Sequence, residues 1–130
     1  MDNSRLILTN RPESLRPLLD FVQKWARERS LPADRLQSLE VAAGKIFRRL
    51  VNYAYQSGET GPITVALAEK DPRLQLMFED DGPPESPPGN PKACEPHNPV
   101  PHLNGLPRLV ESIIYYRTAD QKNRLVVFLN

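Results

Sequence analysis

Two consecutive segments with apolar residues at helical spacing constrain the fold of this chain most. The first begins at Pro12-Glu13-Ser14 and the second at Leu31-Pro32-Ala33-Asp34, sequences that suit the first turn of a helix. Apolar residues three and four positions apart give each predicted helix one buried face. These residues are Leu15, Leu18, Leu19, Val22, Trp25 and Ala26 in the first helix, and Leu36, Leu39, Ala43, Ile46, Phe47, Leu50, Val51 and Ala54 in the second.

The remaining apolar segments have the pattern of strands. Strands are predicted at residues 5–9, 62–68, 73–78, 113–117 and 123–129, and a short helix at residues 106–112. Tight turns at residues 70–72 and 119–122 join two pairs of strands into antiparallel hairpins. Helices and hairpins in this order predict an α+β fold, with helices on one face of a mostly antiparallel sheet.

Length, charge and cysteine content narrow the classes of function. The chain has 130 residues, which suits one domain, and a net charge of +1, which argues against nucleic acid or an anionic membrane as a partner. The single Cys94 excludes an internal disulfide and a cysteine-cluster metal site. Because no apolar run is long enough for a signal peptide or a membrane span, we expect a cytoplasmic protein.

A proline-rich segment follows the predicted strand that ends in Asp80-Asp81-Gly82. Residues 83–101 contain eight prolines in 19 positions, so neither a packed strand nor a helix is expected there. A loop of this length is usually functional or disordered. Ligand sites favour strand ends that a loop covers, so this is the first place to expect a site.

Three short motifs, in order, resemble those of the small anti-sigma factor serine/threonine kinases. They are Val51 with Ala54-Tyr55 near the end of the second helix, Asp80-Asp81-Gly82-Pro83-Pro84, and Gly105-Leu106. These kinases belong to the GHKL (Bergerat) superfamily of ATP-binding domains, shared by gyrase, heat-shock chaperones, histidine kinases and MutL repair proteins. The resemblance covers nearly the whole chain. It implies a single histidine-kinase-like ATPase domain over residues 1–130, built as a two-layer sandwich with three helices on one face of a mostly antiparallel mixed sheet. It also implies an ATP-lid-like, proline-rich loop at residues 83–104.

The resemblance also implies a nucleotide site. Asp80 would accept the exocyclic amine of adenine, Gly82 belongs to the same motif, and Gly105 and Leu106 belong to the second glycine box. A different interpretation of Asp80 is a solvated turn held by bonds from its carboxylate to the backbone.

Several positions depart from the family pattern. Lys45 stands where the family has the glutamate that activates the attacking group, and Arg49 stands where it has the asparagine that holds Mg²⁺. Tyr53 replaces a histidine, and His102 and Leu103 replace two glycines. An ammonium group cannot take up a proton, and a guanidinium offers only donors to a cation that needs oxygen ligands. We therefore expect no catalytic residue at Lys45 and no bound Mg²⁺, although ATP stays a candidate cofactor.

Two further interpretations concern the same helix and the proline-rich loop. Lys45 and Arg49 are four residues apart and share a helix face, either as a cationic seat for phosphate or as two solvated charges. Asn52 could replace the missing metal ligand. It is three residues from Arg49, however, and a three-residue step turns the helix by about 300°, so the two side chains do not point in the same direction. His97 and His102, near Cys94, match no known pattern of metal ligands, and we expect no metal site.

The sequence thus predicts a regulatory protein of the anti-sigma type that is degenerate in Mg²⁺–ATP binding and phosphotransfer. The resemblance implies that it works by protein binding in a partner-switching pathway, with a sigma factor or an anti-sigma antagonist as partner and with homodimer formation. The alternative is an active ATP-dependent kinase that phosphorylates a serine of the antagonist. A third interpretation is a scaffold unrelated to sigma factors.

Overall fold

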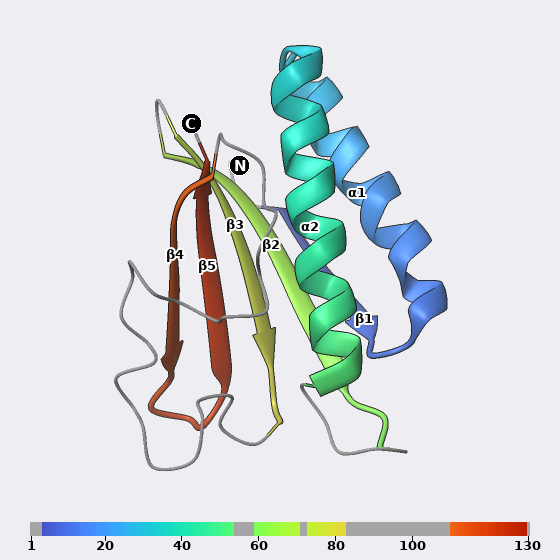
Figure 1. Ribbon diagram of the computed structural model, residues 1–130, viewed down its shortest axis with the longest axis vertical. Helices are drawn as coiled ribbons and strands as arrows, with labels where there is room; N and C mark the ends of the chain where they lie inside the picture. The colour runs from blue at the N-terminus through green and yellow to red at the C-terminus, as the bar shows by residue number, and fades with distance from the viewer. Residues whose placement is uncertain (1–3, 54–58, 71–72, 83–109, 130) are drawn as a thin grey trace.

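The computed structural model describes residues 4–53, 59–70, 73–82 and 110–129. These residues form two layers, a five-stranded sheet and two helices that cover one of its faces (Figure 1). The elements in order are β1 (Ser4–Thr9), the 3-10 turn η1 (Pro12–Ser14), α1 (Leu15–Glu28), α2 (Ala33–Tyr53), β2 (Pro62–Lys70), β3 (Arg73–Asp80), β4 (Val110–Arg117) and β5 (Asn123–Leu129). The predicted α+β fold is confirmed.

The strands lie in the order β1-β2-β3-β5-β4, and each neighbouring pair is antiparallel. Both predicted hairpins are present, since Lys70 pairs with Arg73 and Arg117 pairs with Asn123. The order puts β5 between β3 and β4, so residues far apart in the sequence become neighbours at one end of the sheet. Asp80, the last residue of β3, pairs with Asn123, the first residue of β5.

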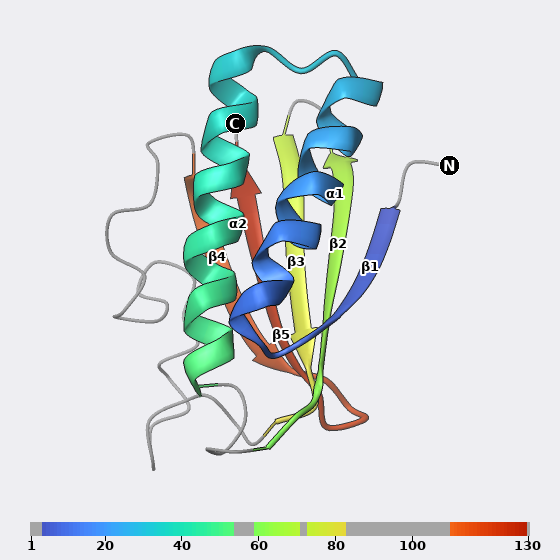
Figure 2. The same cartoon turned by 90° about the vertical axis from the view of Figure 1, so that its right-hand side faces the viewer.

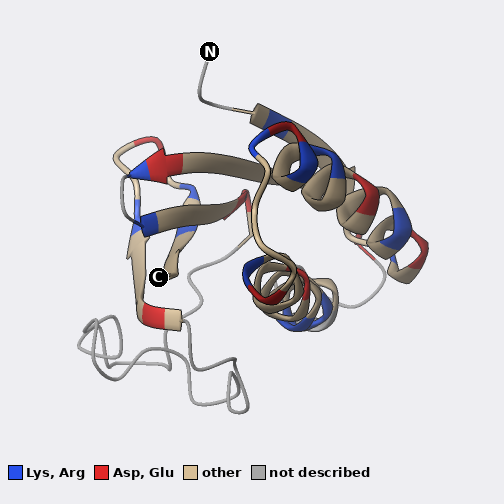
Figure 3. Ribbon diagram, turned by 90° about the horizontal axis from the view of Figure 1, so that it is seen from above, with Lys and Arg blue, Asp and Glu red and all other residues tan. Residues whose placement is uncertain are grey.

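The core lies between the helices and the sheet face that they cover (Figure 2 and Figure 3). The apolar stripes predicted from helical spacing supply it, with Leu18, Val22 and Trp25 from α1 and Ile46 and Phe47 from α2 fully or almost fully buried. Alternate residues of the strands complete the core, because side chains of a strand point in turn to opposite faces. These are Ile63, Val65, Leu67, Leu74, Leu76, Phe78, Leu125, Val127 and Leu129.

Several boundaries differ from the sequence prediction, and at one of them the type of element differs too. The helix predicted at residues 106–112 is wrong for residues 110–112, which begin β4; residues 106–109 lie outside the described part. Val110 pairs with Leu129, and an ion pair of 2.8 Å joins Arg73 Nε on β3 to Glu111 Oε1. Pairing with β5 therefore outweighs the local helical spacing. Strands β2 and β3 each continue two residues beyond their predicted ends, to Lys70 and Asp80, and β1 begins one residue earlier than predicted, at Ser4.

Other predicted features lie outside the described residues, among them the loop at residues 83–104, with Cys94, His97, His102 and Leu103, and the Gly105-Leu106 motif. Neither α1 nor α2 is long and apolar enough to cross a membrane.

Candidate functional site

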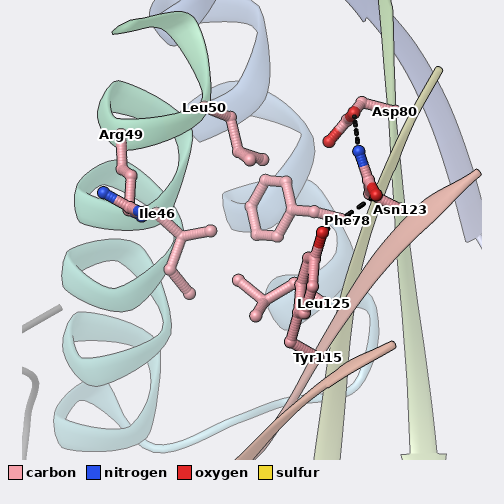
Figure 4. A pocket seen from close by; sticks show the side chains of 8 residues that line it. All are labelled: Ile46, Arg49, Leu50, Phe78, Asp80, Tyr115, Asn123 and Leu125. Atoms are coloured by element: carbon pink, nitrogen blue, oxygen red, sulfur yellow. Dashed lines mark hydrogen bonds between the residues drawn. The ribbon is translucent and has the colours of Figure 1, made fainter. Parts of the chain in front are cut away.

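A pocket lies between α2 and the end of the sheet where β3 stops and β5 begins (Figure 4). Its lining comes from α2, β3, β4 and β5, and it has apolar walls and a polar end. The lining residues are Ile46, Arg49, Leu50, Phe78, Asp80, Tyr115, Asn123 and Leu125.

Strand alternation places Asp80 in this pocket. Leu74, Leu76, Phe78 and Asp80 are alternate residues of β3, so all four side chains face the helix layer. Asp80 is 4% exposed, and burial of a carboxylate is unfavourable unless hydrogen bonds compensate. The predicted solvated turn at this position is therefore wrong in one respect: the carboxylate is buried.

Two donors hold one oxygen of the Asp80 carboxylate. The backbone N–H of Gly82 donates to Oδ1 at 2.9 Å, and Nδ2 of Asn123 donates to the same oxygen at 2.9 Å. The other oxygen, Oδ2, has no hydrogen bond among the described residues and points toward the helix side of the pocket (Figure 4). The pocket therefore offers a fixed carboxylate with one oxygen open to a donor.

The neighbouring strands fix Asn123 in turn. Its Oδ1 accepts from the Tyr115 hydroxyl at 2.9 Å and from Arg117 Nη1 at 2.8 Å. Because a guanidinium only donates, the oxygen of the Asn123 amide must face Arg117 and its nitrogen must face Asp80. The nitrogen also donates to the carbonyl of Gly82 at 3.1 Å. Asp80, Gly82, Tyr115 and Asn123 are buried, and the exposed Arg117 completes their hydrogen bonds from the rim. These five residues form a polar cluster, called the Asp80 cluster below.

Burial raises the pKa of the Asp80 carboxyl above its usual 3.8, because removal from water disfavours the charged form. The hydrogen bonds from Asn123 and Gly82 oppose this rise, the charge of Asp81 adds to it, and the charge of Arg117 opposes it. A carboxyl with a raised pKa in a pocket is a feature that functional sites often share.

The pocket has little free space. Its cavity measures about 10 Å³, which is about the room that one water molecule needs. A purine base is many times larger, so the side chains that line the pocket would have to move to admit one.

The two cationic positions of α2 do not lie together at the pocket. Arg49 is half-buried and lines the pocket, whereas Lys45 is exposed and is not part of the lining. Asn52 lies in α2, but its side chain is outside what the structure describes. Of the predicted nucleotide-binding residues, the structure thus brings Asp80, Gly82 and Arg49 to one place.

The described residues do not suit a divalent cation. No group of three histidine, cysteine, aspartate or glutamate side chains that could hold a metal occurs among them. Asp80 is the one carboxylate in the described lining, and Arg49 brings a positive charge to the same pocket. Mg²⁺ prefers several oxygen ligands in octahedral order, so this set does not fit it.

Sequence reasoning missed Tyr115, Arg117 and Asn123. Asn123 follows Asp80 by 43 positions, and a strand pattern gives no sign of which strand lies beside β3. The final hairpin could have revealed Asn123. Side chains alternate between the two faces of a strand, so Asn123 lies on the same core-facing side as Leu125, where a polar residue needs a hydrogen-bond partner.

Comparison with known proteins identifies the family. The model of the histidine kinase-like ATPase domain matches residues 8–127, nearly the whole chain. The chain belongs to this family. Among solved structures it is similar to the RsbU and RsbW domains of Rv1364c from Mycobacterium tuberculosis, with a TM-score of 0.66 and 12% identity. The match covers 100% of this chain but only 32% of that one, and at this identity it shows the fold alone. No curated protein matches the sequence.

Proposed function

We propose that this histidine kinase-like domain is a regulatory protein of the anti-sigma type that acts by binding a partner and does not carry out Mg²⁺-dependent phosphotransfer. The observation that carries the proposal is the pocket at Asp80. Its cavity has room for about one water molecule, and Arg49 lines it where the family resemblance expects the asparagine that holds Mg²⁺. A guanidinium cannot replace an oxygen ligand.

The partner follows from the same resemblance. A sigma factor or an anti-sigma antagonist would bind the domain in a partner-switching pathway, and the domain would form a homodimer. The solved structure that this chain resembles contains RsbU and RsbW domains, which supports a regulatory role of this kind.

One observation favours the alternative of an active ATP-dependent serine kinase. Asp80 is buried at the pocket, with Oδ2 open to a donor such as the amine of adenine. ATP is therefore the ligand to test first. The exposed Lys45 argues against phosphotransfer, since an ammonium group cannot accept the proton of an attacking hydroxyl.

Titration calorimetry with ATP and ADP, with and without Mg²⁺, tests the proposal. We expect no Mg²⁺-dependent binding to the wild-type protein. Micromolar binding that requires Mg²⁺ would contradict the proposal and favour the kinase. Binding that ignores Mg²⁺ would support a cationic phosphate seat at Arg49.

A double variant and its control test which departures from the family pattern abolish Mg²⁺-dependent ATP binding. Lys45→Glu combined with Arg49→Asn restores the residue types of the family, and we expect it to gain Mg²⁺-dependent binding. Arg48→Asn is the matched control, because Arg48 is exposed on the same helix and does not line the pocket. No gain in the double variant would mean that His102 and Leu103, in place of two glycines, dominate the loss.

A further inference from the structure

Strand β1 is an edge of the described sheet, and no described strand pairs with its outer side. Asn10 N donates to Gly61 O at 3.1 Å, in register with the β1–β2 pairs. In an antiparallel pair, alternate residues point both backbone groups at the partner strand. Leu6 and Leu8 therefore bond to β2, whereas the N–H and C=O of Arg5 and Ile7 point away from the sheet.

Within the described part of the chain, this edge lacks the usual protection against further pairing. Natural edge strands are commonly covered, bulged, or interrupted by proline and lysine. The described β1 has one charged residue, Arg5, and no proline, and it pairs with β2 without a register shift. Ile7 is 69% exposed, the most exposed large apolar side chain among the described residues. An additional strand could pair here without displacing any described element.

A cavity of about 410 Å³ lies beside the same edge, between β1 and α1. The half-buried Phe21 and one edge of the almost fully buried Trp25 border it, and Ser4, Arg5, Lys24 and Glu28 supply its polar lining. Figure 2 shows α1 running next to β1 at this side of the molecule. A peptide that pairs with β1 would therefore have a place for a side chain on the helix side of the sheet.

The charges at this cavity favour an acidic occupant. Glu28 has an ion pair with Arg29 at 3.9 Å, whereas Arg5 and Lys24 have no ion pair among the described residues. A second copy of the chain would bring the same uncompensated cations to the interface, and like charges across an interface are unfavourable.

We propose that the β1 edge is a docking site for an extended, acidic segment of a partner protein, which adds a sixth strand to the sheet. Backbone hydrogen bonds to Arg5 and Ile7 would supply affinity, and alternate side chains would supply specificity. On the side of the sheet away from the helices, the segment would lie beside Ile7 and could pair a carboxylate with Arg5. On the helix side it would lie at the cavity and could pair a carboxylate with Lys24. The site gives the partner binding of the proposed function a place and a chemistry, and it rests on that function.

The probe is a short peptide of alternating valine and glutamate, blocked at both ends and titrated without nucleotide. Trp25, the single tryptophan of the chain, lines the cavity, so its fluorescence reports on occupancy. We expect the fluorescence to change on binding. We also expect hydrogen exchange of the Arg5 and Ile7 amides to slow by at least about tenfold, while Leu6 and Leu8 are protected in both states.

Variants separate backbone pairing from side-chain contact. Ile7→Pro removes one outward N–H and leaves the bonds to β2, so peptide affinity should fall by at least about tenfold. Ile7→Thr keeps that N–H and should change affinity by less than about threefold. If Ile7→Pro does not fold, a peptide N-methylated at its inner amides tests the same bonds, and it should fail to bind wild-type protein.

Charge reversal tests the chemistry of the occupant. Arg5→Glu combined with Lys24→Glu should make the protein prefer a peptide with lysine in place of glutamate. Arg27→Glu, at an exposed position of α1 outside the cavity lining, is the matched control and should leave the preference unchanged.

Three outcomes would overturn the proposal. The first is that the glutamate and lysine peptides bind with equal affinity, or that neither peptide binds. The second is unchanged affinity in Ile7→Pro. The third is a dimer in which the Arg5 and Ile7 amides are protected before peptide is added, because a second copy then occupies the edge. None of these depends on nucleotide, so failure here and failure of the proposed function are distinguishable.

Discussion

An amide side chain has four hydrogen-bonding positions, two on its nitrogen and two on its oxygen. Asn123 uses all of them, toward Asp80 and Gly82 from the nitrogen and toward Tyr115 and Arg117 from the oxygen. A buried polar cluster is stabilising only when its members are satisfied, and the loss of one member leaves several groups unpaired. Asn123 is therefore the residue on which the Asp80 cluster depends most.

Asn123→Ala should destabilise the protein by about 3 kcal/mol, because it leaves buried groups of Asp80 and Tyr115 without their partner. Tyr115→Phe removes a single bond of the cluster and should cost about 1 kcal/mol. Urea unfolding of both variants and the wild type measures the change in the free energy of unfolding. The comparison holds when the three proteins show the same dependence of this free energy on urea concentration. A cost for Asn123→Ala no larger than that for Tyr115→Phe would show that the cluster is not the unit described.

Asp80→Asn should make the protein more stable at neutral pH. An amide oxygen at position 80 can still accept from Gly82 and Asn123, while the buried charge is removed. Burial raises the pKa of Asp80 in the folded state above 3.8, so the folded protein holds this proton more tightly than the unfolded chain does. That contribution to wild-type stability is complete below pH 3.8 and is lost as the pH rises through the folded-state pKa.

The advantage of Asp80→Asn should accordingly be largest near pH 8 and shrink as the pH falls toward 4. Urea unfolding of both proteins across this range measures it. An advantage that does not vary with pH would mean that the carboxyl has the same pKa in the folded and unfolded states.

Among the elements, those with long periodic patterns were predictable. The stripes of α1 and α2 determine which faces are buried, and both hairpins followed from alternation and turns. The start of β4 at Val110 was not predictable, because its apolar spacing suits a helix and only pairing with the neighbouring β5 makes it a strand. Asp80 and Gly82 were predicted as site residues, but their partners Tyr115, Arg117 and Asn123 were missed for a related reason. The cluster depends on which strands are adjacent, and local sequence does not encode that order.

Helix α2 contains a glycine in its interior, where the residue lowers helix stability. A Cβ added to Gly44 would lie 3.9 Å from Leu15 Cδ1, an ordinary van der Waals contact with α1. Gly44→Ala should therefore stabilise the protein by about 1 kcal/mol. Ala43→Gly, at a fully buried position in the same turn, should destabilise it by about 2 kcal/mol. Thermal unfolding tests both; a loss in Gly44→Ala would indicate that α1 and α2 approach more closely than described.

For the whole molecule, the strand order decides where chemistry can occur. It brings the end of β3, the end of β4 and the start of β5 to one end of the sheet, beside the C-terminal half of α2. Arg49 and the Asp80 cluster meet there, whereas the β1 edge lies on the far side of β2 and β3. A partner strand at β1 and a ligand at Asp80 could thus be bound at the same time.

Ligand binding at Asp80 would be visible in the unfolding of the whole molecule, because a ligand that binds only the folded state stabilises it. A ligand at about 100 times its Kd adds about 2.7 kcal/mol, enough to raise the Tm of a protein this size by several degrees. We expect about 1 mM ATP with Mg²⁺ to leave the Tm unchanged, since the pocket has room for about one water molecule and no set of Mg²⁺ ligands in its described lining. A rise with Mg²⁺–ATP that vanishes in Asp80→Asn would show that the pocket opens to a base, and would restore the kinase interpretation. Arg48→Asn, exposed and outside the lining, should respond as the wild type does.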